Sequence, residues 1–173
     1  MTKFLLAALA PAALLLAGAT PALASSTPAA GPGALVFSAV RADDVVTRMF
    51  VWWNEAMKSP DRLTAEAFGQ FFTADAVMRI NGTNRVRGLA NMAERFRMIR
   101  SGLESVQIHT PFVEAFSSPD GSKIFTYHLE SAVKDGKPSH SMVMGYVEVK
   151  DGKIALVNFL SVEGQPGPGH MAP

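Results

Sequence analysis

The sequence predicts an α+β domain in which helices come first and strands follow. Apolar residues recur at helical spacing over residues 40–57, whereas after residue 102 they alternate with polar residues at period two. Asp-Gly dipeptides, which favour tight hairpin turns, stand at residues 120–121, 135–136 and 151–152. This segregation of helices from strands is typical of α+β domains.

A first helix is expected over residues 40–57. Its apolar face is formed by Val45, Met49, Trp52, Trp53 and Ala56. The helix is expected to end before Pro60, because the residue that precedes a proline avoids the helical region. Thr64 is the predicted N-cap of a short second helix that ends near Phe71.

A hairpin and a third helix are expected between residues 76 and 102. Asn81-Gly82 readily supplies the positive φ angles of a two-residue turn, so residues 76–80 and 83–87 are its strands. Apolar residues then recur at helical spacing from Leu89 to Ile99, and Gly102 is a stop signal. Four further strands are expected over residues 105–116, 122–133, 139–149 and 153–163.

Residues 1–24 are predicted to be a secretory signal peptide. Lys3 precedes an apolar run, and small residues at Ala22 and Ala24 match a peptidase site, so cleavage is expected after Ala24. A membrane anchor is the alternative, but Pro11 interrupts a run that is shorter than the roughly 20 residues of a spanning helix. We therefore expect an exported protein, periplasmic or secreted, without membrane attachment after cleavage.

The rest of the chain corresponds to one domain at residues 39–163, between a flexible linker at 25–38 and a disordered tail at 164–173. The absence of cysteine excludes disulfides, thiolate metal sites and a cysteine nucleophile. Acidic and basic residues balance once Lys3 is removed, so a nucleic-acid partner is not expected. Six arginines between Arg79 and Arg100 face only Glu94, which suggests either an anion-attracting rim or, the reading we prefer, a solvated surface.

Several short motifs resemble those of the nuclear-transport-factor-like superfamily, and within it the SnoaL-like branch. They are Trp52-Trp53-Asn54-Glu55-Ala56, Phe72-x-x-Asp75-Ala76-Val77, Arg87-Gly88, Phe96 and the Asp-Gly turns. The resemblance covers residues 40–163. It implies a cone-shaped, curved antiparallel sheet wrapped around the N-terminal helices (the SnoaL-like or cystatin-like roll), a pocket at the open end, no cofactor, and often a homodimer through the outer sheet face.

The family includes ketosteroid isomerase, scytalone dehydratase, limonene epoxide hydrolase, polyketide cyclases and noncatalytic binding domains. Matching the turn at residues 134–138 to that of the isomerases places His128 and Glu130 on the pocket side of their strand. The isomerase's own catalytic residues are not matched, because its general base falls at or near Ile80, its second aspartate at Gly145, and its tyrosine nearest Trp52 or Trp53. A ketosteroid isomerase is therefore not expected.

Three functions stay open: ligand binding, enzymatic activity and, as a further alternative, a dimeric interaction domain. The first is binding of a small apolar or amphipathic molecule, because the interior is rich in methionine and aromatic residues and lacks a recognisable catalytic set. The expected ligand-binding residues are Trp52, Trp53, Met78, Ile80, Phe96, Val143, Gly145, Phe159 and Ser161.

The alternative is a cofactor-independent lyase, isomerase or cyclase-like enzyme. Its candidate catalytic residues are His128 as acid/base and Glu130 as the group that orients it, because residues i and i+2 of a strand share a face. The alternative, which we prefer, is that the pair forms a polar patch at the mouth of the cone or a subunit contact. His109, His128 and Glu130 also suggest a facial metal site, but the spacing supports only the i, i+2 pair, so no metal is predicted.

Overall fold

The computed structural model describes residues 38–166. The predicted signal peptide at 1–24, the linker up to residue 37 and the tail from residue 167 onward lie outside the described residues. Among the helices of residues 38–166, none has both the length and the apolar character that crossing a membrane requires.

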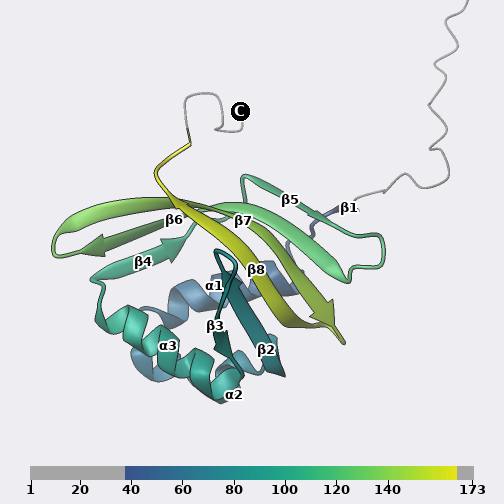
Figure 1. The fold of residues 1–173 in the computed structure, drawn as a ribbon, viewed down its shortest axis with the longest axis horizontal. Coiled ribbons are helices and arrows are strands. Elements are labelled where there is room, and N and C mark those ends of the chain that lie inside the picture. The colour runs from purple at the N-terminus through teal and green to yellow at the C-terminus, as the bar shows by residue number, and fades with distance from the viewer. Residues whose placement is uncertain (1–37, 167–173) are drawn as a thin grey trace, which may run out of the picture. The chain divides into compact units, whose positions relative to one another are not determined.

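Helices pack against one face of a large curved sheet (Figure 1). The helical elements of residues 38–166 are α1 (Val45–Ala56), the 3-10 turn η1 (Pro60–Arg62), α2 (Ala65–Phe68) and α3 (Leu89–Ser101). The strands are β1 (Ser38–Ala39), β2 (Phe72–Ile80), β3 (Thr83–Arg87), β4 (Ser105–Ile108), β5 (Glu114–Ser117), β6 (Lys123–Lys134), β7 (Lys137–Lys150) and β8 (Lys153–Glu163). The sheet order is β1-β5-β6-β7-β8-β2-β3, with β4 beside β6.

The predicted hairpin turns are present, and their positive φ angles explain why Asn-Gly and Asp-Gly pairs occupy them. Asn81, Asp135 and Asp151 have φ angles of 52°, 50° and 50°, and each is followed by a glycine with positive φ. Two successive positive φ angles are the requirement of the tight turn whose twist matches that of a hairpin. The antiparallel series β6-β7-β8 follows from two of these turns.

The structure differs from the sequence prediction at four places. The strand expected over 105–116 is divided into β4 and β5, which pair with different parts of β6; Pro111 lies between them and has no N–H for a ladder. Helix α1 begins at Val45 rather than near residue 40, because Asp44 caps it and accepts from the backbone N–H groups of Val46 and Thr47. β2 runs parallel to β8, so the sheet is mixed rather than antiparallel throughout. The short strand β1 was not predicted.

The inner face of the sheet is the one that the resemblance to the isomerases implied, because the strand face that carries His128 and Glu130 lies inside. On β6, β7 and β8 the side chains of Ile124, Thr126, His128, Val143, Val147, Val157 and Phe159 are buried. Residues of the opposite parity lie outside, and Met144, Leu160 and Val162 are 41%, 57% and 58% exposed. These buried side chains pack against the apolar faces of α1, α2 and α3. The N-cap of α2 is Thr64, as predicted, and its hydroxyl accepts from the Ala67 N–H at 3.1 Å.

Candidate functional site

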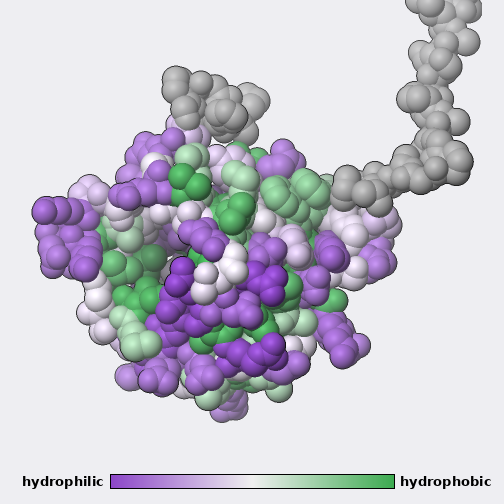
Figure 2. Space-filling model, viewed as in Figure 1, coloured by the Kyte–Doolittle hydropathy of each residue, from purple (hydrophilic) through white to green (hydrophobic). Residues whose placement is uncertain are grey.

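A cavity of about 320 Å³ lies between the helices and the inner face of the sheet. Its volume falls at the lower end of the range for small-molecule sites. The wall is mainly apolar and is formed by α1, α2, α3 and strands β2, β4, β6, β7 and β8. Its aromatic side chains are Phe50, Trp53, Phe68, Phe72, Phe96 and Phe159. Figure 2 shows hydrophobic side chains gathered at the hollow between α3 and the sheet.

A second groove, of about 470 Å³, lies between α1 and β4, and it is more polar. Its charged side chains already have partners within the described residues. Lys58 pairs with Glu55 at 2.6 Å, and Arg100 donates to the carbonyl oxygens of Met57 and Leu103. The apolar cavity is therefore the better candidate for a ligand site.

Most of the predicted ligand-binding residues reach the cavity wall. Those on it are Trp53, Met78, Ile80, Phe96, Val143, Phe159 and Ser161, together with the predicted catalytic residue Glu130. Trp52, Gly145 and His128 do not line it. Met49, Phe50 and Arg95 line it without having been selected from the sequence.

Trp52 and Gly145 have other structural tasks. The Trp52 ring lies 5.0 Å from that of Phe68 and 5.2 Å from that of Phe71, on the side of α1 turned toward α2. Gly145 has a φ of 154°, and a Cβ there would lie 2.1 Å from the Asn158 carbonyl oxygen. Glycine is thus required where β7 passes close to β8 in the bent sheet.

His128 lies behind the cavity wall rather than on it. The residue is completely buried, and its ring centroid is 4.8 Å from that of Phe50 and 5.4 Å from that of Phe159. Its Nδ1 is 3.2 Å from Thr126 Oγ1, and its Nε2 is 3.7 Å from Glu130 Oε1. Nε2 has no hydrogen-bond partner among the described residues.

The Thr126 hydroxyl and Nδ1 of His128 form a buried polar contact, and its direction is tied to the tautomer of the ring. When Thr126 donates to Nδ1, the hydrogen of the neutral ring resides on Nε2, on the side of Glu130. Thr126, His128 and Glu130 alternate along one face of β6, so they form a polar line that ends at the cavity wall.

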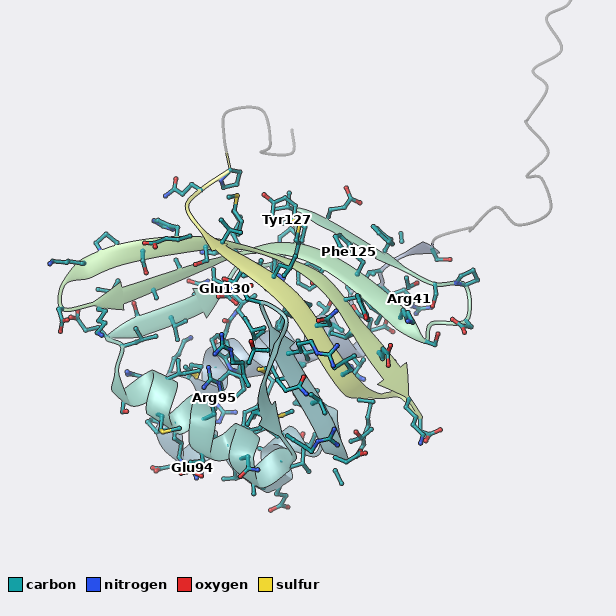
Figure 3. The ribbon with its side chains drawn as sticks, in the orientation of Figure 1. Arg41, Glu94, Arg95, Phe125, Tyr127 and Glu130 are labelled. Atoms are coloured by element: carbon teal, nitrogen blue, oxygen red, sulfur yellow. The ribbon has the colours of Figure 1, made fainter. Side chains whose placement is uncertain are left out.

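Arg95 and Glu130 are the charged side chains on the wall. They come from α3 and β6 and lie on facing sides of the hollow, whereas Glu94 points away from it (Figure 3). Arg95 is half-buried, and no hydrogen bond or ion pair holds it within residues 38–166. A sequence signal for it existed, because Arg95 lies three residues after Met92 and four before Ile99, on the inward stripe of the helix.

Within residues 38–166, no three His, Cys, Asp or Glu side chains come together as a metal site. His109 instead lies with its Nε2 3.0 Å from Ser131 Oγ, in an exposed position. The side chain that contacts His128 Nδ1 is that of Thr126 and not that of His109.

A curved mixed sheet over helices, enclosing an apolar cavity, defines the α+β nuclear-transport-factor-like cone class. The family model described as SnoaL-like domain matches residues 46–157, and the chain belongs to this family. A search of curated proteins gave no match.

Solved structures share the fold at low sequence identity. An NTF2-like protein of unknown function from an Exiguobacterium species superposes with a TM-score of 0.56 and 14% identity, covering 70% of this chain and 99% of that one. A protein with a ketosteroid isomerase-like fold from Catenulispora acidiphila, in complex with trimethylamine, gives 0.54 and 13%, covering 69% and 85%. A putative polyketide cyclase from Xanthomonas campestris gives 0.52 and 16%, covering 67% and 89%. At these identities the likeness shows the fold alone.

Proposed function

We propose that the protein binds a small apolar or amphipathic molecule in the cavity between its helices and its sheet. The observation that carries the proposal is the roughly 320 Å³ cavity, with aromatic and aliphatic walls and few polar groups. Sites of this kind bury the apolar body of a ligand and fix its orientation with a small number of polar contacts. One structural neighbour was solved in complex with a small amine, which is in keeping with a ligand-binding role for this fold.

Trp53 adds a second observation. The residue is only 5% exposed, it lies on the cavity wall, and its indole Nε1 has no hydrogen-bond partner among the described residues. Buried tryptophan N–H groups usually find an acceptor, because an unpaired donor in the interior loses its hydration without compensation. An oxygen atom of a bound molecule would supply that acceptor.

Native mass spectrometry of the protein purified from its own host tests this proposal. We expect an added mass that is lost when the protein is gently unfolded. The free molecule would then be identified, and the apo protein should take it up again. A protein that carries no ligand and accepts none from an organic extract of its host would contradict the proposal.

A second candidate function is a cofactor-independent lyase, isomerase or cyclase-like reaction, and the position of Glu130 favours it. Its side chain is 36% exposed and reaches the cavity wall, so it would be the group that accepts a proton from a bound molecule. His128 would then be a positioning residue that offers its Nε2–H to the carboxylate from behind. These roles are the reverse of those expected from the sequence.

Proton transfer by Glu130 can be measured without knowing the substrate. In D2O, nuclear magnetic resonance would follow the exchange of the α-hydrogens of 2-octanone, an enolisable ketone. We expect exchange above the buffer rate in the wild type, loss in Glu130→Gln and retention in Glu94→Gln, whose side chain points away from the hollow. Equal exchange in the wild type and Glu130→Gln would rule out this role.

We also propose that a second copy covers the outer face of β7 and β8. Leu160 and Val162 are more than half exposed there, and Met144 is 41% exposed. Phe125 and Tyr127 of β6 lie on the same side of the sheet (Figure 3). A contiguous apolar surface of this kind is characteristic of interfaces, and a twofold axis would pair the patch with itself.

Export is the last part of the proposal. The observation behind it is the signal-peptide pattern of residues 1–24, which lie outside the described part of the chain. The intact mass of the protein isolated from its host should correspond to a chain that begins at Ser25. A full-length mass beginning at Met1 would contradict export by this route.

A further inference from the structure

The two charged residues on the cavity wall do not have the same surroundings. Glu130 has a polar neighbour, because the Nε2 of His128 lies 3.7 Å from its carboxylate, at a distance too long for a hydrogen bond. Arg95 has no such partner within residues 38–166. Of the two charged side chains, Arg95 is the one without a polar neighbour among the described residues.

Arg95 differs from the other arginines between residues 79 and 100, because Arg85 and Arg87 are exposed on β3 and the remaining three are held by the protein. Arg97 donates to the Leu63 carbonyl at 2.8 Å, Arg100 donates to backbone carbonyls, and Arg79 donates to Asn84 at 2.9 Å. Each of those guanidinium groups is fixed by the protein itself. Arg95 is a half-buried residue on an apolar wall, and no internal acceptor occupies its guanidinium N–H groups, so they can bind an anionic group of a ligand.

We infer that the molecule held in the cavity is an amphipathic carboxylic acid, with its carboxylate on Arg95 and its apolar body among the aromatic side chains. The inference rests on the ligand-binding function proposed above and specifies its ligand class. Arginine suits this task because its planar group offers paired N–H donors that match the two oxygens of a carboxylate.

Three probes with the same chain and different head groups test the inference: octanoate, 1-octanol and octylamine. Their binding would be measured by isothermal titration calorimetry at neutral pH. We expect octanoate to bind at least tenfold more tightly than octanol, in line with a hydrogen bond to a charged group, and octylamine to bind most weakly. Added salt should weaken octanoate binding and leave octanol binding nearly unchanged.

Variants locate the effect. Arg95→Gln should remove the preference for octanoate while octanol binding persists, and Arg95→Lys should retain part of the preference. Arg85→Gln is the matched control, because Arg85 is exposed on β3 and does not line the cavity. Circular dichroism would verify that each variant is folded.

The outcomes separate the two proposals. If octanol and octanoate bind equally, or octylamine binds best, the carboxylate inference is overturned while ligand binding in the cavity stands. If the preference survives in Arg95→Gln, Arg95 is not the anchor and the inference is overturned as well. If none of the three probes binds, the proposed ligand-binding function falls together with the inference.

Discussion

Replacement of Gly145 by alanine should destabilise the fold strongly, because β7 passes β8 too closely there for any side chain. The new Cβ would lie 2.1 Å from the Asn158 carbonyl oxygen and 2.9 Å from the Phe159 Cα. Both are backbone atoms, so rotation of a side chain cannot relieve the contact. Overpacking costs about 1–3 kcal/mol, and a backbone conformation that is unfavourable for alanine adds about 1–3 kcal/mol. We expect Gly145→Ala to lose about 3 kcal/mol or more of the free energy of unfolding.

Urea denaturation followed by circular dichroism would measure this loss at one fixed protein concentration. Gly102→Ala is the matched control, because φ is −93° at Gly102 and the nearest atoms to its added Cβ are 3.7 Å away. The control should remain within about 1 kcal/mol of the wild type. A loss below about 1 kcal/mol for Gly145→Ala, or one equal to that of the control, would refute the close approach of the two strands.

Three further predictions concern a cap, an acidic turn and the outer sheet face. Asp44→Ala should cost about 1 kcal/mol by removing the N-cap of α1, whereas Asp44→Asn should cost less in the same urea assay. Hydrogen bonds, led by that from the Ser118 hydroxyl, lower the pKa of Asp120 from 3.8 to about 2. The ionised group therefore stabilises the fold above pH 3.8, and that contribution is lost as the pH falls toward 2. Asp120→Asn should reduce the dependence of the free energy of unfolding on pH in this window. An unchanged pH dependence would contradict the role of these hydrogen bonds. Leu160→Glu should convert a dimer to a monomer in analytical ultracentrifugation while Met98→Glu, on α3, should not; equal masses for both variants would contradict the proposed interface.

Turn chemistry explains how much of the fold the sequence could predict. Asn81, Asp135 and Asp151 stand before glycines, and these pairs define hairpins through local backbone preferences alone. Once the turns are fixed, alternation assigns His128 and Glu130 to one face. The parallel pairing of β2 with β8 depends on residues about 80 positions apart in the chain, and no local signal marks it.

The site was less predictable than the fold, because cavity and core are lined by the same kinds of residue. Trp52 and Trp53 are adjacent and equally apolar, yet the helix turns one toward Phe68 and Phe71 and the other toward the cavity. The place of His128 behind the wall depends on how Phe50 and Phe159 pack in front of it. Such packing follows from the whole fold and not from spacing along one strand.

The cavity as a binding site is the central claim, and methionine methyl groups test it most directly. Met49 and Met78 line the cavity, whereas Met98 and Met144 are 59% and 41% exposed elsewhere. In a protein labelled with 13C at the methionine methyls, titration with 1-octanol should shift the Met49 and Met78 resonances and leave those of Met98 and Met144 in place. If the cavity methionines do not respond, or the exposed ones respond more strongly, the cavity is not the binding site.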